Sequence, residues 1–111
     1  MTPPPNLDTR LAQRLRTTPT AIAQLCDRWK IVELALFGSV LRDDFRPDSD
    51  IDLLIDFEPQ HGWSLLDLVD LQEECEHLFD RPVDIVQRKN LTNPYRRQDI
   101  LSTQQTLYVR D

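Results

Sequence analysis

Two aspartates separated by one residue, Asp50 and Asp52, begin an apolar segment and could bind a divalent cation. Residues i and i+2 of a β-strand point to the same face, so a strand here would place both carboxylates side by side. Carboxylates that close repel one another, and a cation between them relieves the repulsion. Oxygen ligands favour Mg²⁺, which commonly binds one or two carboxylates together with the phosphates of a substrate. The pair therefore predicts a magnesium site.

A Gly-Ser pair, Gly38 and Ser39, precedes Asp50 by a spacer of ten residues and could bind phosphate. Glycine allows the backbone to approach a ligand closely, and a helix that begins directly behind it points free N–H groups at an anion. The Ser39 hydroxyl can donate to a phosphate oxygen. Arg42, one helical turn further on, could reach the same group. We therefore predict that Gly38, Ser39 and Arg42 bind a nucleotide.

A third carboxylate, Asp84, lies between Val83 and Ile85 in a short apolar segment. If Val83 and Ile85 share the buried face of a strand, Asp84 points to the opposite face. Three carboxylates would converge if this strand lay beside the one that begins near Asp50. Three acids around two metal ions are suited to in-line phosphoryl or nucleotidyl transfer. Each motif alone is more often a turn or a solvated site, but their combination favours catalysis.

Hydrophobic periodicity predicts the elements that must position these residues. Strands are expected over 31–37, 51–57, 82–87 and 105–110, and helices over 7–15, 19–29, 39–43, 64–79 and 94–101. The 51–57 strand should have one apolar face, and the 64–79 helix should turn Glu74 and Glu76 to solvent. This order predicts a single α/β (α+β) domain over residues 1–111, with residues 1–6 as a loose extension.

Composition limits the class of protein. The chain has 111 residues, a mean hydropathy of −0.48 and a net charge of −6, which are typical of one soluble domain. No apolar run is long enough for a membrane span, and the negative charge argues against direct nucleic-acid binding. The N-terminus does not resemble a secretion signal, and the two cysteines lack a CxxC spacing. A cytoplasmic location is expected.

Residues 38–57 resemble the signature of the minimal nucleotidyltransferases of the DNA-polymerase-beta superfamily, Gly-Ser followed by ten residues and Asp-x-Asp. The segment Val83–Val86 is similar to the strand that carries the third acid of that family. The likeness extends over nearly the whole chain, which also resembles the MntA-type antitoxins paired with HEPN-domain toxins. It implies the nucleotidyltransferase fold, a small mixed sheet with flanking helices.

The same resemblance implies an activity, namely transfer of AMP from ATP to a tyrosine of the HEPN toxin, which silences its ribonuclease site. In that family pattern Gly38 and Ser39 would hold the triphosphate, and Asp50 and Asp52 would bind two Mg²⁺ ions. Asp84 would bind one metal ion and orient or deprotonate the attacking hydroxyl. The three-acid pattern is complete in this chain.

Two other functions stay open from the sequence. The protein could neutralise its partner by binding alone, with an inactive site. It could also nucleotidylate a small molecule such as an aminoglycoside, although enzymes of that kind usually have a second domain. Arg96 and Arg97, beside Tyr95, could contact a partner or a nucleotide, or simply form a solvated helix face. The sequence indicates neither the acceptor, the base preference, the number of AMP units nor the oligomeric state.

Overall fold

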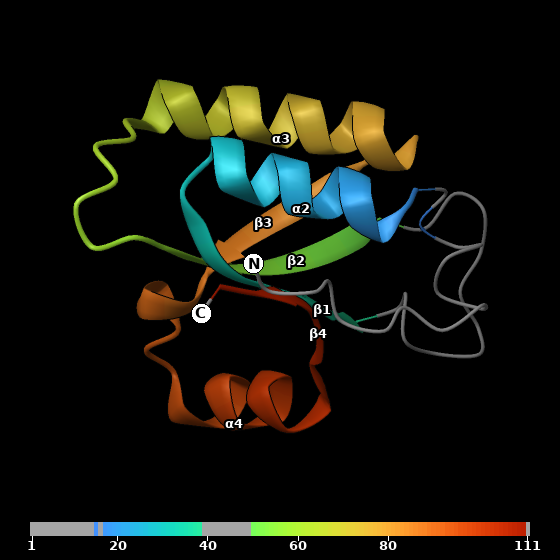
Figure 1. Ribbon diagram of the computed structural model, residues 1–111. Coiled ribbons are helices and arrows are strands. Elements are labelled where there is room, and N and C mark those ends of the chain that lie inside the picture. Colours follow the sequence, from blue (N-terminus) through green and yellow to red (C-terminus); the bar gives the residue numbers. More distant parts are fainter. Residues whose placement is uncertain (1–14, 16, 39–49, 111) are drawn as a thin grey trace.

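The computed structural model describes residues 15, 17–38 and 50–110, which form a four-stranded sheet covered by helices (Figure 1). The strand order is β3-β2-β1-β4, with β1 pairing antiparallel to β2 and β4, and β2 pairing parallel to β3. The strands are β1 (Ile31–Phe37), β2 (Ile51–Phe57), β3 (Val83–Gln87) and β4 (Gln105–Val109). This mixed sheet confirms the predicted fold class.

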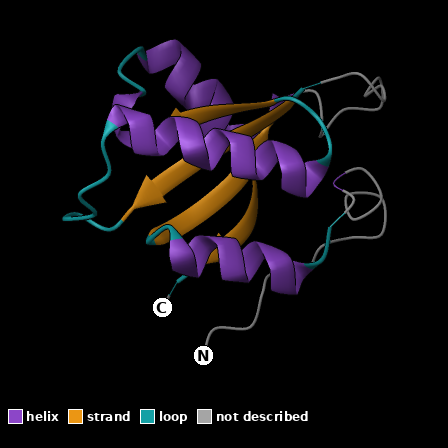
Figure 2. Ribbon diagram, turned by 90° about the horizontal axis from the view of Figure 1, so that it is seen from above, coloured by secondary structure: helices purple, strands orange, loops and turns teal. Residues whose placement is uncertain are grey.

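Among the described residues, three α-helices cover the two faces of the sheet unequally. Helices α2 (Pro19–Arg28) and α3 (Leu65–Phe79) lie on one face, and α4 (Pro94–Thr103) lies on the other (Figures 1 and 2). A polar N-cap starts each helix and accepts a hydrogen bond from its first turn: Thr18, Ser64 and Asn93. No helix of the described residues is both long and apolar enough to cross a membrane.

The larger hydrophobic core fills the space between the sheet and helices α2 and α3. Alternate residues of the central strands enter it, because side chains of a strand point to its two faces in turn. Its fully buried members include Leu25, Leu34, Leu36, Ile51, Leu53, Ile55, Leu71 and Phe79. This core fixes which residues of β1, β2 and β3 remain for the opposite face.

A smaller apolar cluster lies on the α4 face of the sheet. It joins Ala35, Phe37 and Leu54 to Leu91 and Ile100. Leu54 is completely buried, so the prediction that strand 51–57 has only one apolar face was wrong. Leu54 breaks the alternation of apolar and polar residues because α4, a helix distant in sequence, covers the middle of this face.

The predicted elements agree closely with the described ones. Helix α4 continues to Thr103, two residues beyond the expected end, and a short 3₁₀ helix over Arg88–Asn90 was not predicted. The expected helix over 39–43 and the extension over 1–6 lie outside the described residues, as does the helix over 7–15 except for the buried Leu15.

The two glutamates expected to face solvent instead bind neighbouring elements. Glu74 forms an ion pair with Arg28 at 2.6 Å and accepts a hydrogen bond from the indole of Trp29. Glu76 accepts a hydrogen bond of 3.1 Å from the backbone N–H of Val83. Both side chains are half-buried, because α2 and β3 supply donors that the helical pattern alone does not reveal.

The two cysteines are buried free thiols in the larger core. Burial raises the pKa of Cys26 to about 12, and burial likewise raises the pKa of Cys75 to about 12. The folded state therefore retains thiol protons that the unfolded chain releases above about pH 8.5.

We expect the free energy of unfolding to fall as the pH rises from about 8.5 toward 12, because deprotonation then favours the unfolded chain. Urea titrations at pH 7.5 and pH 10 measure this decline. The Cys26→Ala, Cys75→Ala double variant should show a smaller one. At pH 8 a thiol reagent should modify both cysteines only after unfolding. Equal reaction rates with native and unfolded protein would contradict the burial argument.

Leu71→Ala should lower the free energy of unfolding by about 3 kcal/mol, because Leu71 is 0% exposed in the larger core. Leu66→Ala is the matched control on the same helix, where the side chain is 79% exposed. It should change the stability by less than about 0.5 kcal/mol. Chemical denaturation of both variants checks the difference, and equal losses would contradict the described orientation of α3.

Candidate active site

Parallel pairing of β2 with β3 places two of the predicted acidic residues opposite one another. Asp52 pairs with Asp84 in the register of these strands. Neighbouring strands lie about 4.8 Å apart, and paired residues point to the same face. Ile51 and Val83, the preceding residues of each strand, enter the larger core, so both carboxylates lie on the α4 face. The strand adjacency on which their convergence depended is therefore present.

Gly38 ends β1 directly beside this acidic pair. Its φ is +78°, a conformation that glycine adopts readily and other residues rarely do. A Cβ atom at this position would overlap the Oδ2 atom of Asp52. Phe37, the residue before it, is paired with Asp52 in the antiparallel register of β1 and β2. Glycine is thus required here both by the backbone conformation and by the close approach of a carboxylate.

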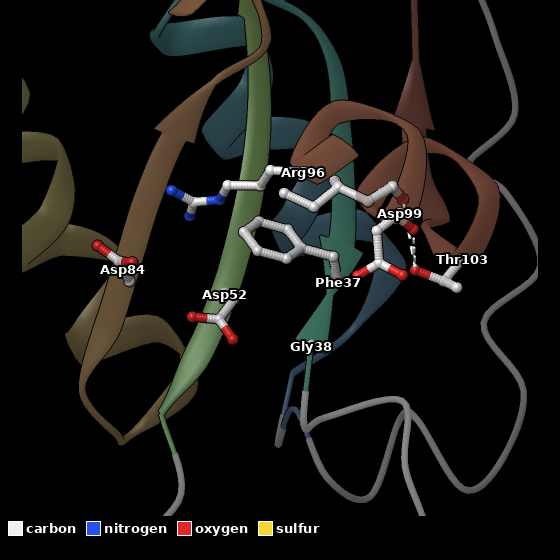
Figure 3. A pocket seen from close by; sticks show the side chains of 8 residues that line it. Phe37, Gly38, Asp52, Asp84, Arg96, Asp99 and Thr103 are labelled. Carbon is white, nitrogen blue, oxygen red and sulfur yellow. Dashed lines mark hydrogen bonds between the residues drawn. The ribbon is translucent and has the colours of Figure 1, made fainter. Parts of the chain in front are cut away.

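An open cavity of about 740 Å³ surrounds these groups (Figure 3). Its volume falls within the range of roughly 300–1,000 Å³ that is usual for small-molecule sites. The strands form one wall and helix α4 forms the other. The described lining residues are Phe37, Gly38, Asp52 and Asp84 from the strands, and Arg96, Asp99, Ile100 and Thr103 from the helix.

Among the described residues, the structure brings no other predicted site residue into the cavity. Asp50 is exposed just before β2 and is not among the described residues that line the cavity. Ser39 and Arg42 lie outside the described residues. Within the described ranges, no three His, Cys, Asp or Glu side chains form a group that could hold a metal ion. The three-acid site and the phosphate-binding roles therefore stay predictions.

The Asp52 and Asp84 pair suits Mg²⁺. Carboxylate oxygens are hard ligands, and one or two of them suffice when substrate phosphates and water complete an octahedral shell. Asp52 is half-buried and Asp84 is exposed, so the pair faces the cavity and remains accessible to a ligand.

The helical wall of the cavity was not predicted. Arg96, Asp99 and Thr103 are spaced i, i+3 and i+7, which places them on one face of α4. This spacing can be read from the sequence, but it does not tell which part of the molecule the face approaches. The packing of Ile100, on the same face, against the sheet decides that question.

Comparison with known protein families agrees with this arrangement. The family model for the nucleotidyltransferase domain matches residues 19–105. The chain belongs to the nucleotidyltransferase family. The matched span contains Gly38, Asp50, Asp52 and Asp84, and the resemblance inferred from the Gly-Ser and Asp-x-Asp motifs is thereby confirmed.

Individual nucleotidyltransferases support the same assignment. Protein adenylyltransferase MntA of Thermococcus cleftensis is 38% identical over 68 residues, which make up 61% of this chain and 67% of that protein. A solved structure of a candidate minimal nucleotidyltransferase is 37% identical with a TM-score of 0.67, covering 91% of this chain and 97% of its own. The nucleotidyltransferase fold is thus shared by proteins of similar sequence.

A more distant likeness extends to a toxin–antitoxin complex. The structure of tri-AMPylated Shewanella oneidensis HEPN toxin with its MNT antitoxin contains a chain that is 19% identical, with a TM-score of 0.54. The match covers 82% of this chain and 69% of that one. At this level of identity the likeness concerns the fold.

Gly38→Ala should reduce nucleotidyl transfer about 100-fold, because the added methyl group displaces the Asp52 carboxylate. Gly62→Ala is the matched control, since Gly62 has a φ of +77° but no atom within 4 Å of an added Cβ. Both variants should lose about 1 kcal/mol of stability through backbone strain. Transfer assays and denaturation curves measure the two effects, and similar activities of the two variants would contradict a role for the Gly38–Asp52 contact.

Proposed function

We propose that this protein is a Mg²⁺-dependent protein adenylyltransferase that transfers AMP from ATP to a tyrosine of a HEPN-domain toxin, and so neutralises it as an antitoxin. The observation that supports this most directly is the in-register pair Asp52 and Asp84 on the wall of an open cavity. Paired carboxylates on one face of a sheet are suited to metal-assisted transfer of a nucleotidyl group.

Relatives support the choice of acceptor class. One similar protein is named a protein adenylyltransferase, and a structural neighbour is an antitoxin in complex with an AMPylated HEPN toxin. The position of Asp84 also suits a macromolecular acceptor. Asp84 is exposed on β3, which is an edge strand of the described sheet, so a tyrosine on the surface of another protein can approach it.

The proposed reaction is a single displacement at the α-phosphorus of ATP. The phenolic oxygen of the acceptor tyrosine forms a bond to that phosphorus. The bond from the phosphorus to the oxygen that bridges to the β-phosphate breaks, and pyrophosphate leaves with the electron pair. Tyrosine has a pKa near 10 and is a weak nucleophile at neutral pH, so removal of its proton is part of the barrier. Asp84 orients the hydroxyl and accepts this proton.

Each of the other site residues has a role in binding. Asp50, Asp52 and Asp84 would hold the two Mg²⁺ ions, and Gly38, Ser39 and Arg42 would bind the triphosphate. Magnesium supplies Lewis-acid neutralisation of phosphate charge. The close approach of Gly38 to Asp52 leaves no space for a side chain between the phosphate-binding corner and the acidic pair. This proximity lets one ligand contact both.

Asp52→Asn and Asp84→Asn should each reduce transfer to a purified partner toxin by about 100-fold or more, because each removes a charged metal ligand. Incubation with labelled ATP and Mg²⁺, followed by mapping of the labelled tyrosine, measures the activity. Asp56→Asn is the matched control on β2, since Asp56 forms an ion pair with Arg88 at 2.8 Å, away from the cavity. It should leave transfer close to wild type.

Three outcomes would overturn parts of this proposal. Absence of labelling with a verified partner excludes protein adenylylation. Full activity of the Asp52→Asn variant excludes the proposed metal site. Protection of cells by an inactive Asp52→Asn variant assigns neutralisation to binding rather than to AMP transfer.

A further inference from the structure

Helix α4 brings a positive charge to the cavity that holds the acidic pair. The lining residues described include three carboxylates, those of Asp52, Asp84 and Asp99, and one cation, Arg96. In Figure 3 the guanidinium of Arg96 extends from α4 toward the strands that carry Asp52 and Asp84. Hydrogen bonds from an arginine to a phosphate are strong because both groups are charged, and they are often bidentate.

The position of Arg96 is fixed by its helix. Asn93 caps α4, and its side-chain oxygen accepts hydrogen bonds from the N–H groups of Tyr95 at 3.0 Å and Arg96 at 3.1 Å. One turn later, Ile100 is 5% exposed and packs in the smaller apolar cluster. The cap and this anchor hold the Cα atom of Arg96 over the cavity, while its exposed side chain can still adapt to a ligand.

Three other arginines of the described residues are engaged in ion pairs. Arg28 binds Glu74, Arg88 binds Glu33 and Asp56, and Arg110 binds Glu58. No ion pair within the described ranges involves the Arg96 guanidinium. Its planar set of N–H donors matches the oxygens of a phosphate in a bidentate geometry.

The remaining polar groups of the helical wall are unsuited to an anion. Asp99 is itself negative. The Thr103 hydroxyl donates a hydrogen bond of 2.8 Å to the backbone carbonyl of Asp99, within its own helix. The backbone N–H group of Arg96 donates its hydrogen bond to the side-chain oxygen of Asn93. Among the α4 residues that line the cavity, the Arg96 side chain is therefore the group best suited to contact a phosphate.

We propose that Arg96 binds the phosphate chain of the nucleotide from the helix side of the cavity, opposite the metal-binding carboxylates. This inference rests on the proposed function, because it assumes that a nucleoside triphosphate occupies the cavity. Arg96 donates to non-bridging phosphate oxygens and holds the chain against the strand wall. It thereby sets both the affinity for the triphosphate and its orientation toward the acceptor.

The test is the affinity of each variant for AMP-PNP, an ATP analogue with an imido group between the β- and γ-phosphates. Titration calorimetry in Mg²⁺ without acceptor protein measures this affinity, so that no AMP is transferred. Arg96→Ala should weaken binding about 10-fold to 100-fold, the range for loss of hydrogen bonds to a charged group. Arg96→Lys keeps the positive charge but lacks the planar guanidinium group, and it should weaken AMP-PNP binding less than Arg96→Ala does. Adenosine, which lacks phosphates, should bind wild type and Arg96→Ala equally.

Arg97→Ala is the matched control. Arg97 is the neighbouring arginine on α4, but it does not line the cavity, and its guanidinium donates to the Leu91 carbonyl at 3.5 Å. This variant should bind AMP-PNP like wild type. Thermal melts establish that all variants are folded, which is expected because Arg96 is exposed.

The possible outcomes separate this inference from the function on which it rests. Unchanged AMP-PNP affinity of Arg96→Ala overturns the role of Arg96 while leaving the proposed function standing. Unchanged affinity together with a raised KM for the acceptor protein assigns Arg96 to the acceptor instead. Failure of the wild-type protein to bind any nucleotide overturns the proposed function, and the inference with it.

Discussion

The parallel pairing of β2 with β3 is the constraint on which the site depends. Because the two strands run in the same direction and in register, Asp52 and Asp84 point to the same face at neighbouring positions. A shift of one residue in this register would turn Asp84 into the larger core and Val83 toward the cavity. The burial of Val83 and Ile85 under α3 opposes such a shift, so the core that stabilises the fold also aligns the acids.

The two faces of the sheet differ in how far helices cover them. Helices α2 and α3 bury the central part of one face, and this face carries the larger of the two apolar clusters. Helix α4 covers the other face only over the smaller cluster around Leu54 and Ile100. Beyond that cluster, toward Gly38, the described residues leave the face open. Within the part of the chain that the structure describes, the cavity lies where helix α4, with its ten residues, does not cover the sheet.

The net charge of the chain and the charge of its proposed substrate have the same sign. The chain is acidic overall, with a net charge of −6, yet its family acts on anionic nucleotides. A polyphosphate near Asp52, Asp84 and Asp99 requires compensation by cations at the site itself rather than by the long-range field of the protein. In the proposed function, magnesium supplies part of this charge and arginine supplies part.

The order of the elements, most of their boundaries and the motif residues could all be predicted from the sequence, because each depends on local spacing. Thr18, Ser64 and Asn93 indicate helix starts, the period of two identifies β2, and the Gly-Ser and Asp-x-Asp motifs identify the family. The burial of Leu54 and the approach of Arg96 to the acids could not be predicted in this way. Both depend on where α4 packs, and that helix meets β2 only after the chain has passed through α3 and β3. Periodicity shows that a helix has an apolar face, but only long-range packing determines which surface that face covers and which polar side chains it carries into the cavity.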